Sequence, residues 1–341
     1  MRKNRFIALG MAVALSVSAL SGCGVKSDTP IIGKIVGLEK DEIFKVEDLI
    51  CKKSEYSLLF MDMQMKYKTD FGGSVDWQAK IDNTRTLEDF VRDKTKEDIT
   101  ARYTMASLAK SRGVTLTANE QKAVEEAATK YYETLGAAEK DYTSATLEDV
   151  KNLYTNYMLA EKLYNGLTEH IGENVSDEEA RAIQIQYIRI SVDKYKKSKV
   201  KSIFQDITDL VNGGYQEFSR EAKQYSQDET NELILKKNEA IAKFEKEAFK
   251  LSDKEISNLI EDGNNYYLLY CVNSYLKEET QANKNKIIQS LKQAEFDNQY
   301  QAFLNTADTD FNTTVWENIA ISDNAEIKAN TLMTYYKSMK K

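Results

Sequence analysis

The sequence has few of the residues that interrupt helices or build reactive sites. Pro30 is its only proline, so continuous helix is sterically allowed almost everywhere downstream of it. His170 is its only histidine, which excludes any site that needs two imidazoles. Basic side chains number 47 against 54 acidic ones, which gives a net charge of -7. Nucleic-acid-binding proteins usually carry an excess of basic residues, so this composition does not indicate one. With 42% hydrophobic residues, the composition excludes a disordered chain.

The first residues form a segment of their own. Three cationic residues precede an apolar run over residues 6–20, and this pattern predicts a signal peptide in residues 1–22. The run is too short for a membrane span of the usual length. It ends in Leu-Ser-Gly-Cys, which resembles the bacterial lipobox, the motif at which a diacylglycerol is attached to the cysteine sulfur. The sequence therefore predicts lipidation at Cys23.

Cleavage ahead of Cys23 removes three positive charges and no acids, so the mature chain is more acidic than the precursor. An acidic protein surface is held off anionic lipid, which makes the attached lipid the membrane contact. Residues 23–42 then form a lipidated tether that leads into the first domain. The alternative is an ordinary secretory signal in which Cys23 is incidental.

Two cysteines remain, Cys51 and Cys271. Outside the cell they could form a disulfide, and the sequence leaves this pairing open. The apolar run around Cys271 favours two buried thiols, because free cysteine often packs as a small hydrophobic residue.

Residues 43–176 predict an N-terminal helical domain. Apolar residues recur at helical spacing behind polar N-caps, such as the capping box that begins at Thr117 and the cap at Thr146. Each predicted helix has one apolar face, so several must pack together. Three methionines alternate at residues 61–65. They are interpreted either as a flexible surface for client proteins or as core filling, in which Met61 and Met65 share one helix face.

Residues 177–276 predict a small α+β domain. A capping box at residues 176–179 is followed by a strand over residues 183–190, then by helical patterns and a closing strand over residues 266–272. We expect these two strands to pair at the centre of the sheet. The chain then returns to helix, and we expect residues 277–341 to pack on the N-terminal domain. The predicted fold class is mainly α with an inserted α+β domain.

Three stretches in this region carry a family resemblance. They are Gly-Tyr-Gln-Glu-Phe at residues 214–218, Phe-Glu-Lys-Glu-Ala-Phe at 244–249 and Asn-Tyr-Tyr-Leu-Leu at 265–269. Together with the lipobox and the returning helix, they resemble the extracytoplasmic foldases of the SurA and PrsA class, especially the Gram-positive lipoproteins. The resemblance implies a helical chaperone domain, completed by the C-terminal helix, into which a parvulin-like prolyl isomerase domain is inserted.

The active site that this resemblance implies is degenerate. Tyr187 and Tyr267 stand where parvulins carry two histidines. Asp228 matches the family's acidic position, and Phe244 and Phe249 match its pocket aromatics. The two tyrosines could preserve the strand packing while filling the site of a proline ring; alternatively, they are simply residues that suit a strand.

Other departures weaken the site further. The family's glycine-rich loop is replaced by residues 229–238, and Ala240 stands in place of a pocket methionine. His170 lies before the domain, beside a predicted helix end, where a structural role is expected. Neither a metal nor a cofactor is implied.

Three functions follow as hypotheses. The first is a membrane-anchored chaperone on the outer face of the cytoplasmic membrane, which binds unfolded or nascent secreted polypeptides and whose parvulin-like module is weakly active or inactive. The second is an active peptidyl-prolyl isomerase with an unusual pocket. The third is a solute-binding lipoprotein, which is disfavoured because residues 43–175 supply almost no strand pattern.

Overall fold

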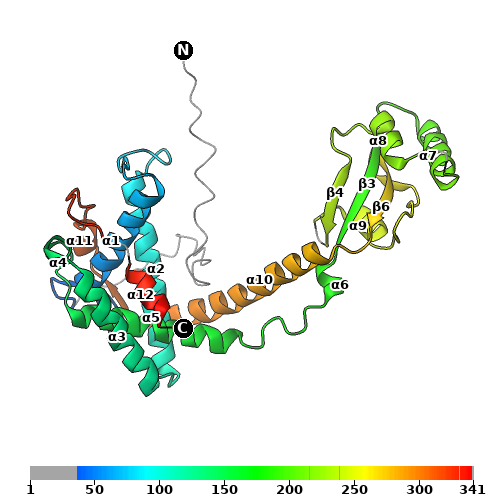
Figure 1. The fold of residues 1–341 in the computed structure, drawn as a ribbon. Helices are drawn as coiled ribbons and strands as arrows, with labels where there is room; N and C mark the ends of the chain where they lie inside the picture. The colour runs from blue at the N-terminus through cyan, green and yellow to red at the C-terminus, as the bar shows by residue number, and fades with distance from the viewer. Residues whose placement is uncertain (1–36, 215, 238, 330, 340–341) are drawn as a thin grey trace, which may run out of the picture. The chain divides into compact units, whose positions relative to one another are not determined.

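A computed structural model describes residues 37–339 apart from residues 215, 238 and 330. The chain divides into two compact units, which we call the helical unit (Met1–Glu169 with Gln293–Lys341) and the sheet unit (His170–Lys292). The predicted signal peptide and Cys23 lie outside the described residues. Consistent with the predicted fold class, the described chain is mostly helical with two small antiparallel sheets (Figure 1). The domain limits given above remain predictions.

The helical unit is built around long helices that start at polar caps. Its helices are α1 (Lys53–Asp70), α2 (Leu87–Ser111), α3 (Ala118–Thr134), α4 (Ala137–Thr143), α5 (Leu147–Thr168), α11 (Thr313–Glu317) and α12 (Leu332–Ser338), with the last turns of α10 (Lys277–Leu304). The predicted caps are confirmed, because the Thr117 and Thr146 hydroxyls each accept the backbone N–H three residues on. Helix α2 packs along α5.

A small sheet in this unit corrects the sequence analysis, which treats residues 43–175 as helical. Strands β1 (Glu42–Val46), β2 (Leu49–Lys52) and β7 (Thr309–Phe311) form an antiparallel sheet in the order β2-β1-β7. Phe44 pairs with Phe311, and their rings stack with centroids 6.3 Å apart. Because β1 is short and one of its partners lies near the other end of the chain, the local sequence carries little strand signal.

The core of the helical unit is rich in tyrosine and includes the chain's C-terminal segment. The Tyr154 hydroxyl donates to the Leu332 carbonyl at 2.6 Å, and the Tyr336 hydroxyl donates to Glu161 at 2.7 Å. Met61 and Met65 are buried in this core, which decides between the two interpretations of the methionines in favour of core filling.

The sheet unit contains one four-stranded antiparallel sheet in the order β4-β3-β6-β5. Its elements are α6 (Asp177–Ala180), β3 (Ala182–Ser191), α7 (Lys197–Asn212), α8 (Phe218–Tyr225), β4 (Glu232–Lys236), α9 (Ala242–Ala248), β5 (Ile260–Asp262) and β6 (Asn265–Asn273), with the first turns of α10. The opening strand β3 and the closing strand β6 are central neighbours, so that prediction is confirmed.

Alternate residues of β3 and β6 face opposite layers of this unit. Ile188 and Ile190 share a core cluster with α7 and α8, whereas Ile183 and Ile185 share one with α9. The sheet is therefore covered by helices on both faces. Cys271 in β6 and Cys51 in β2 are both buried free thiols, as the sequence favours.

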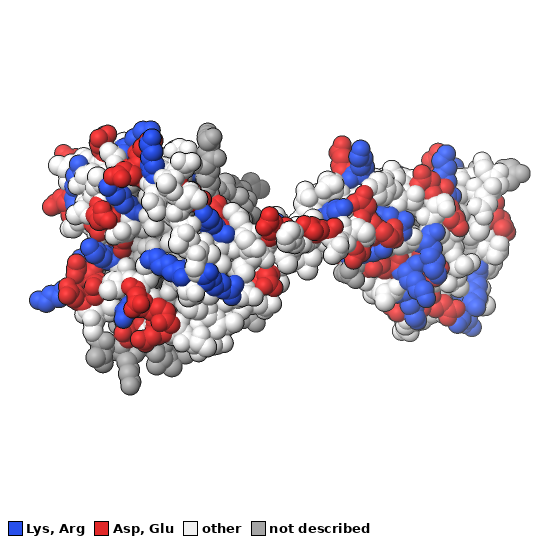
Figure 2. All heavy atoms as spheres, turned by 90° about the horizontal axis from the view of Figure 1, so that it is seen from below, with Lys and Arg blue, Asp and Glu red and all other residues white. Residues whose placement is uncertain are grey.

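Two whole-molecule properties bear on function. On the face drawn in Figure 2, basic and acidic side chains are interspersed over both units, without an extended patch of one sign. Among the described residues, no helix is both long enough and apolar enough to cross a membrane.

Candidate functional site

The predicted parvulin-like site lies on the face of the sheet that α9 covers. Phe244 of α9 is buried and meets both tyrosines edge-on. Its ring centroid is 5.9 Å from that of Tyr187 on β3, at 81°, and 5.5 Å from that of Tyr267 on β6, at 87°. The structure thus brings three of the predicted site residues into one aromatic cluster. Edge-to-face packing of this kind is favourable between rings, so Phe244 holds both tyrosines against the sheet.

The fourth predicted residue, Asp228, is engaged by an arginine. Arg189 of β3 donates from Nε to both Asp228 oxygens, at 2.8 and 3.0 Å, and from Nη2 to Oδ1 at 2.5 Å. Its Nη1 donates to Asn265 at 3.0 Å. These bonds raise the pKa of the Arg189 guanidinium, and they are of the charge-assisted kind that fixes both partners. The carboxylate is therefore occupied by a neighbouring cation rather than presented to a substrate.

The two tyrosines supply no general base. Burial raises the pKa of Tyr187, and the nearby negative charge of Asp228 raises it further. Burial also raises the pKa of Tyr267. Both phenols therefore stay neutral at physiological pH, since the ordinary value is already about 10. The Tyr187 hydroxyl donates to the Thr230 carbonyl at 2.9 Å, so it secures the loop before β4.

Phe249 packs on the same core cluster, but its ring makes different contacts. The guanidinium carbon of Arg181 lies 5.2 Å from its centroid and the Lys237 ammonium 5.6 Å from it. Phe249, the second aromatic residue that the resemblance implies for the pocket, therefore has two cations against its ring. His170 is exposed at the end of α5, with Nδ1 2.8 Å from Glu173.

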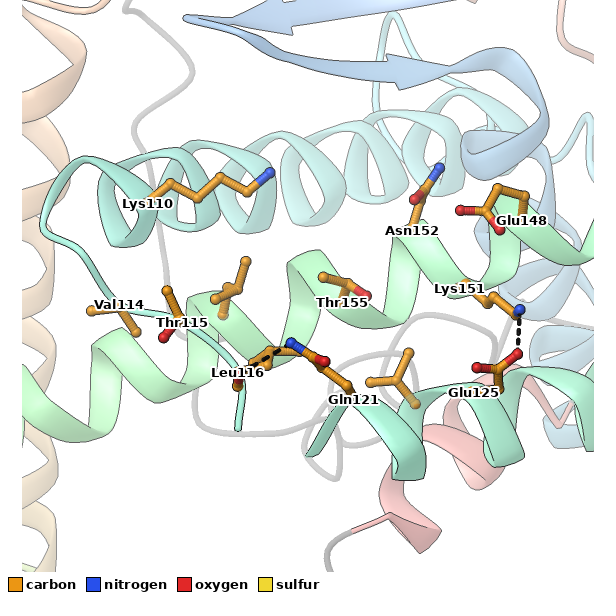
Figure 3. Close-up of a pocket in the computed structure, with 12 residues that line it drawn as sticks. Lys110, Val114, Thr115, Leu116, Gln121, Glu125, Glu148, Lys151, Asn152 and Thr155 are labelled. Atoms are coloured by element: carbon orange, nitrogen blue, oxygen red, sulfur yellow. Dashed lines mark hydrogen bonds and ion pairs between the residues drawn. The ribbon is translucent and has the colours of Figure 1, made fainter. Parts of the chain in front are cut away.

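A second candidate site, which sequence reasoning missed, is a cleft in the helical unit (Figure 3). Its volume is about 360 Å³, and its walls come from α3, α5 and the end of α2. Val124 and Leu159 are buried at its base, and Val114 and Leu116 are half-buried beside them. The remaining lining residues are Lys110, Thr115, Gln121, Glu125, Glu148, Lys151, Asn152 and Thr155.

The polar groups of this cleft fall into two kinds. Lys151 is paired with Glu125 at 2.6 Å, and Gln121 donates to the Leu116 carbonyl at 3.2 Å. By contrast, the side chains of Asn152 and Thr155 make no hydrogen bond within the described part of the chain, although both line the cleft. The cleft therefore offers an apolar base and polar groups that remain available to a ligand.

Comparison with known proteins gives structural neighbours only. No family model matches the chain, and no curated protein matches it. Solved structures that resemble it include foldases and chaperones. A peptidylprolyl isomerase, PrsA, of Bacillus cereus is 16% identical over 78% of this chain and 100% of its own, with a TM-score of 0.29. The foldase PrsA of Lactococcus lactis is 11% identical over 86% and 98%, with a TM-score of 0.31.

A SurA-like chaperone of Campylobacter jejuni is also similar, with 12% identity over 80% of this chain and 99% of its own, and a TM-score of 0.25. Likeness at these scores carries no functional conclusion, so the assignment of function depends on the residues themselves.

Arg189 is the residue of the candidate site in the sheet unit that sequence reasoning missed. A signal was present, because Arg189 follows Tyr187 by two residues in a strand and so shares its face. It also pairs across the sheet with Tyr267. Among the described residues, no group of three or more metal-ligating side chains is placed to hold a metal ion.

Proposed function

We propose that the protein is a chaperone for unfolded secreted polypeptides, held on the outer face of the cytoplasmic membrane by a lipid on Cys23. The observation that carries this proposal is the cleft of the helical unit. Its base is apolar at Val124 and Leu159, while Asn152 and Thr155 offer uncommitted polar groups above it. An unfolded chain presents both apolar side chains and unpaired backbone groups, and a cleft of this composition can receive both.

The parvulin-like site supports a binding role over catalysis. Prolyl isomerisation crosses a barrier of about 18–20 kcal/mol, and a pocket lowers it by desolvating and twisting the imide bond. Two contacts support the binding role: the rings of Tyr187 and Tyr267 pack edge-on against Phe244, at the positions where the family resemblance implies that pocket, and Asp228 is bonded to Arg189. The sheet unit is thus proposed to serve as a weakly active or inactive module. The resemblance of the sequence to the SurA and PrsA class agrees with this division of roles.

Filling the cleft tests the chaperone proposal. Thr155→Arg places a long side chain in the cleft from a half-buried position on α5, whereas Asn165→Arg adds the same residue at an exposed position of that helix outside the cleft. The measurement is the light scattering of an aggregating unfolded client with each protein present. We expect Thr155→Arg to lose most of the suppression and Asn165→Arg to keep it. Equal activity of both variants, at equal helical content, would show that clients bind elsewhere.

The lipid anchor has its own test. We expect Cys23→Ala to yield protein that is released from membranes and that lacks the lipid-dependent cleavage. The measurement is the membrane fraction together with the mass of the N-terminal peptide. Membrane-bound Cys23→Ala protein with an unchanged processed mass would exclude lipidation at this residue.

A further inference from the structure

One lysine of the cleft lacks a neutralising partner. Lys110 lies near the end of α2 and lines the cleft, and Figure 3 draws its side chain extended along that helix. Within the described part of the chain it makes no ion pair and no hydrogen bond, whereas the other lysine of the lining, Lys151, is paired with Glu125. The Lys110 side chain is exposed, and partial burial of its ammonium lowers its pKa. The cleft therefore presents to a ligand an exposed cation that has no partner among the described residues.

The rest of the lining defines the length and polarity of a ligand. Glu148 and Leu159 are the first and last residues of α5 that line the cleft. At a rise of about 1.5 Å per residue this stretch of α5 spans roughly 16 Å, which an extended chain covers with about five residues. Asn152 and Thr155 lie between them and can bond to backbone groups of such a chain. Glu148, which is exposed, disfavours an acidic group at its own end.

We infer that the cleft binds a short extended segment of an unfolded polypeptide in which one acidic side chain lies among apolar residues, and that Lys110 receives the carboxylate. This inference rests on the proposed function and specifies its clients. The complementary pairs are the carboxylate with Lys110, the apolar side chains with Val124 and Leu159, and the backbone with Asn152 and Thr155. A chain with a basic residue at the same place meets an unpaired like charge and is disfavoured.

The test compares three labelled peptides of the form Leu-Val-X-Leu-Val, in which X is Asp, Asn or Lys. Fluorescence anisotropy measures their binding to the purified whole chain, to Lys110→Glu and to Lys130→Glu, an exposed lysine of α3 outside the cleft. We expect the Asp peptide to bind about five- to tenfold more tightly than the Asn peptide, and the Lys peptide more weakly still. Lys110→Glu should reverse this order of affinities, and Lys130→Glu should keep it. Added salt should reduce the differences in affinity between the peptides.

The outcomes separate this inference from the proposed function. Equal affinities for the three peptides, in a protein that still suppresses client aggregation, would overturn the charge preference and leave the chaperone proposal standing. A wild-type protein that neither binds the peptides nor suppresses client aggregation would overturn both the inference and the chaperone proposal. If no peptide binds and Thr155→Arg converts a dimer into a monomer in sedimentation, the cleft holds a second copy of the chain and the inference is wrong. A peptide order that Lys110→Glu leaves unchanged would also overturn it.

Discussion

The two units bury different kinds of side chain. The core of the helical unit includes charged groups, among them Glu55, Asp62 and Arg102, together with several tyrosines. In the sheet unit, Glu221 is the only charged residue that is buried among those described, and the core combines alternating apolar residues of β3 and β6 with apolar residues of the helices that cover the sheet. One unit is therefore organised by specific polar contacts and the other by a periodic apolar pattern.

The polar contacts of the helical unit join segments that are distant in the chain. Asp62 accepts the backbone N–H of Leu332 at 3.0 Å, and Glu139 accepts that of Lys328 at 2.9 Å. A buried carboxylate without such a partner is costly, so these bonds are needed once the acids are inside. A core held by polar contacts between distant segments therefore gives no local sequence pattern from which it could be predicted. An alternating strand does give such a pattern.

The largest expected effect comes from breaking the apolar core of the sheet unit. Phe218 is buried there and stacks on Tyr270, with ring centroids 5.3 Å apart. We expect Phe218→Ala to lower the free energy of unfolding of this unit by about 3–5 kcal/mol. Hydrogen exchange read by mass spectrometry should show lost protection in the sheet unit only. The matched change at exposed Leu210, Leu210→Ala, should cost less than about 0.5 kcal/mol.

The corresponding change in the helical unit removes a buried cation. Arg102 donates from Nε to the Asp98 oxygens at 2.9 and 3.0 Å, and its guanidinium lies 4.4 Å from the Tyr157 ring centroid. We expect Arg102→Met to destabilise this unit by about 2–3 kcal/mol, below the usual range for a broken buried pair, because Asp98 remains 27% exposed. Denaturant unfolding measures the loss. Lys94→Met, which removes an exposed ion pair, should change little; an equal loss there would contradict the comparison.

A pH titration should distinguish the two cores. Burial raises the pKa of Glu55 to about 7, although the carboxylate accepts the Lys52 backbone N–H at 2.7 Å. The unfolded value is about 4.3, so the folded state holds an extra proton between these values. The contribution of protonated Glu55 to the free energy of unfolding is complete below about pH 4 and is lost as the pH rises through about 7. Its size is roughly 1.4 kcal/mol for each unit by which the folded and unfolded pKa values differ.

Glu55→Gln should reduce that pH dependence in the helical unit but not abolish it, because burial also raises the pKa of Asp62 in the same core to about 6. The sheet unit should show none over the same range, because the exposed carboxylates Asp253 and Glu261 have lowered pKa values and titrate at more acidic pH. Thermal unfolding between pH 4 and 8, with exchange protection assigned to each unit, is the measurement. A parallel pH dependence in both units would mean that Glu55 is not its source.

The smallest expected effect concerns catalysis at the degenerate site. We expect little or no acceleration of a proline peptide's isomerisation by the wild type, by Asp228→Ala or by the double variant Tyr187→His with Tyr267→His. Restoring both imidazoles leaves Arg189 bonded to the acid and Phe244 packed over residues 187 and 267, and groups that act as one unit do not contribute additively. Strong wild-type catalysis that Asp228→Ala abolishes would instead support the isomerase hypothesis.

The sequence predicts the parts of this fold whose signals are local. The pairing of β3 with β6 follows from two alternating segments, and the helix starts at Thr117 and Thr146 follow from their caps. The sheet formed by β1, β2 and β7 could not be predicted in this way, because its strands have three to five residues and its register is set by a partner from the other end of the chain.

The candidate sites show the same division. The meeting of Tyr187, Tyr267 and Phe244 could be expected from the family resemblance, and the geometry places them together. The Arg189–Asp228 pair depends on how the loop before β4 folds back on β3, and the cleft depends on how three helices pack. Neither arrangement is encoded in the spacing of residues along a single element.

The strand β7 has a consequence for the order in which the chain folds as it is synthesised. It completes a sheet that begins at Glu42, and the buried residues Leu332 and Tyr336 follow it. If the chain emerges from its N-terminus, the sheet unit is wholly available while the helical unit still lacks its last strand and its final helix. Until residues 309–311 have emerged, β1 keeps an unpaired edge, so a strand near the start of the chain is completed only near its end.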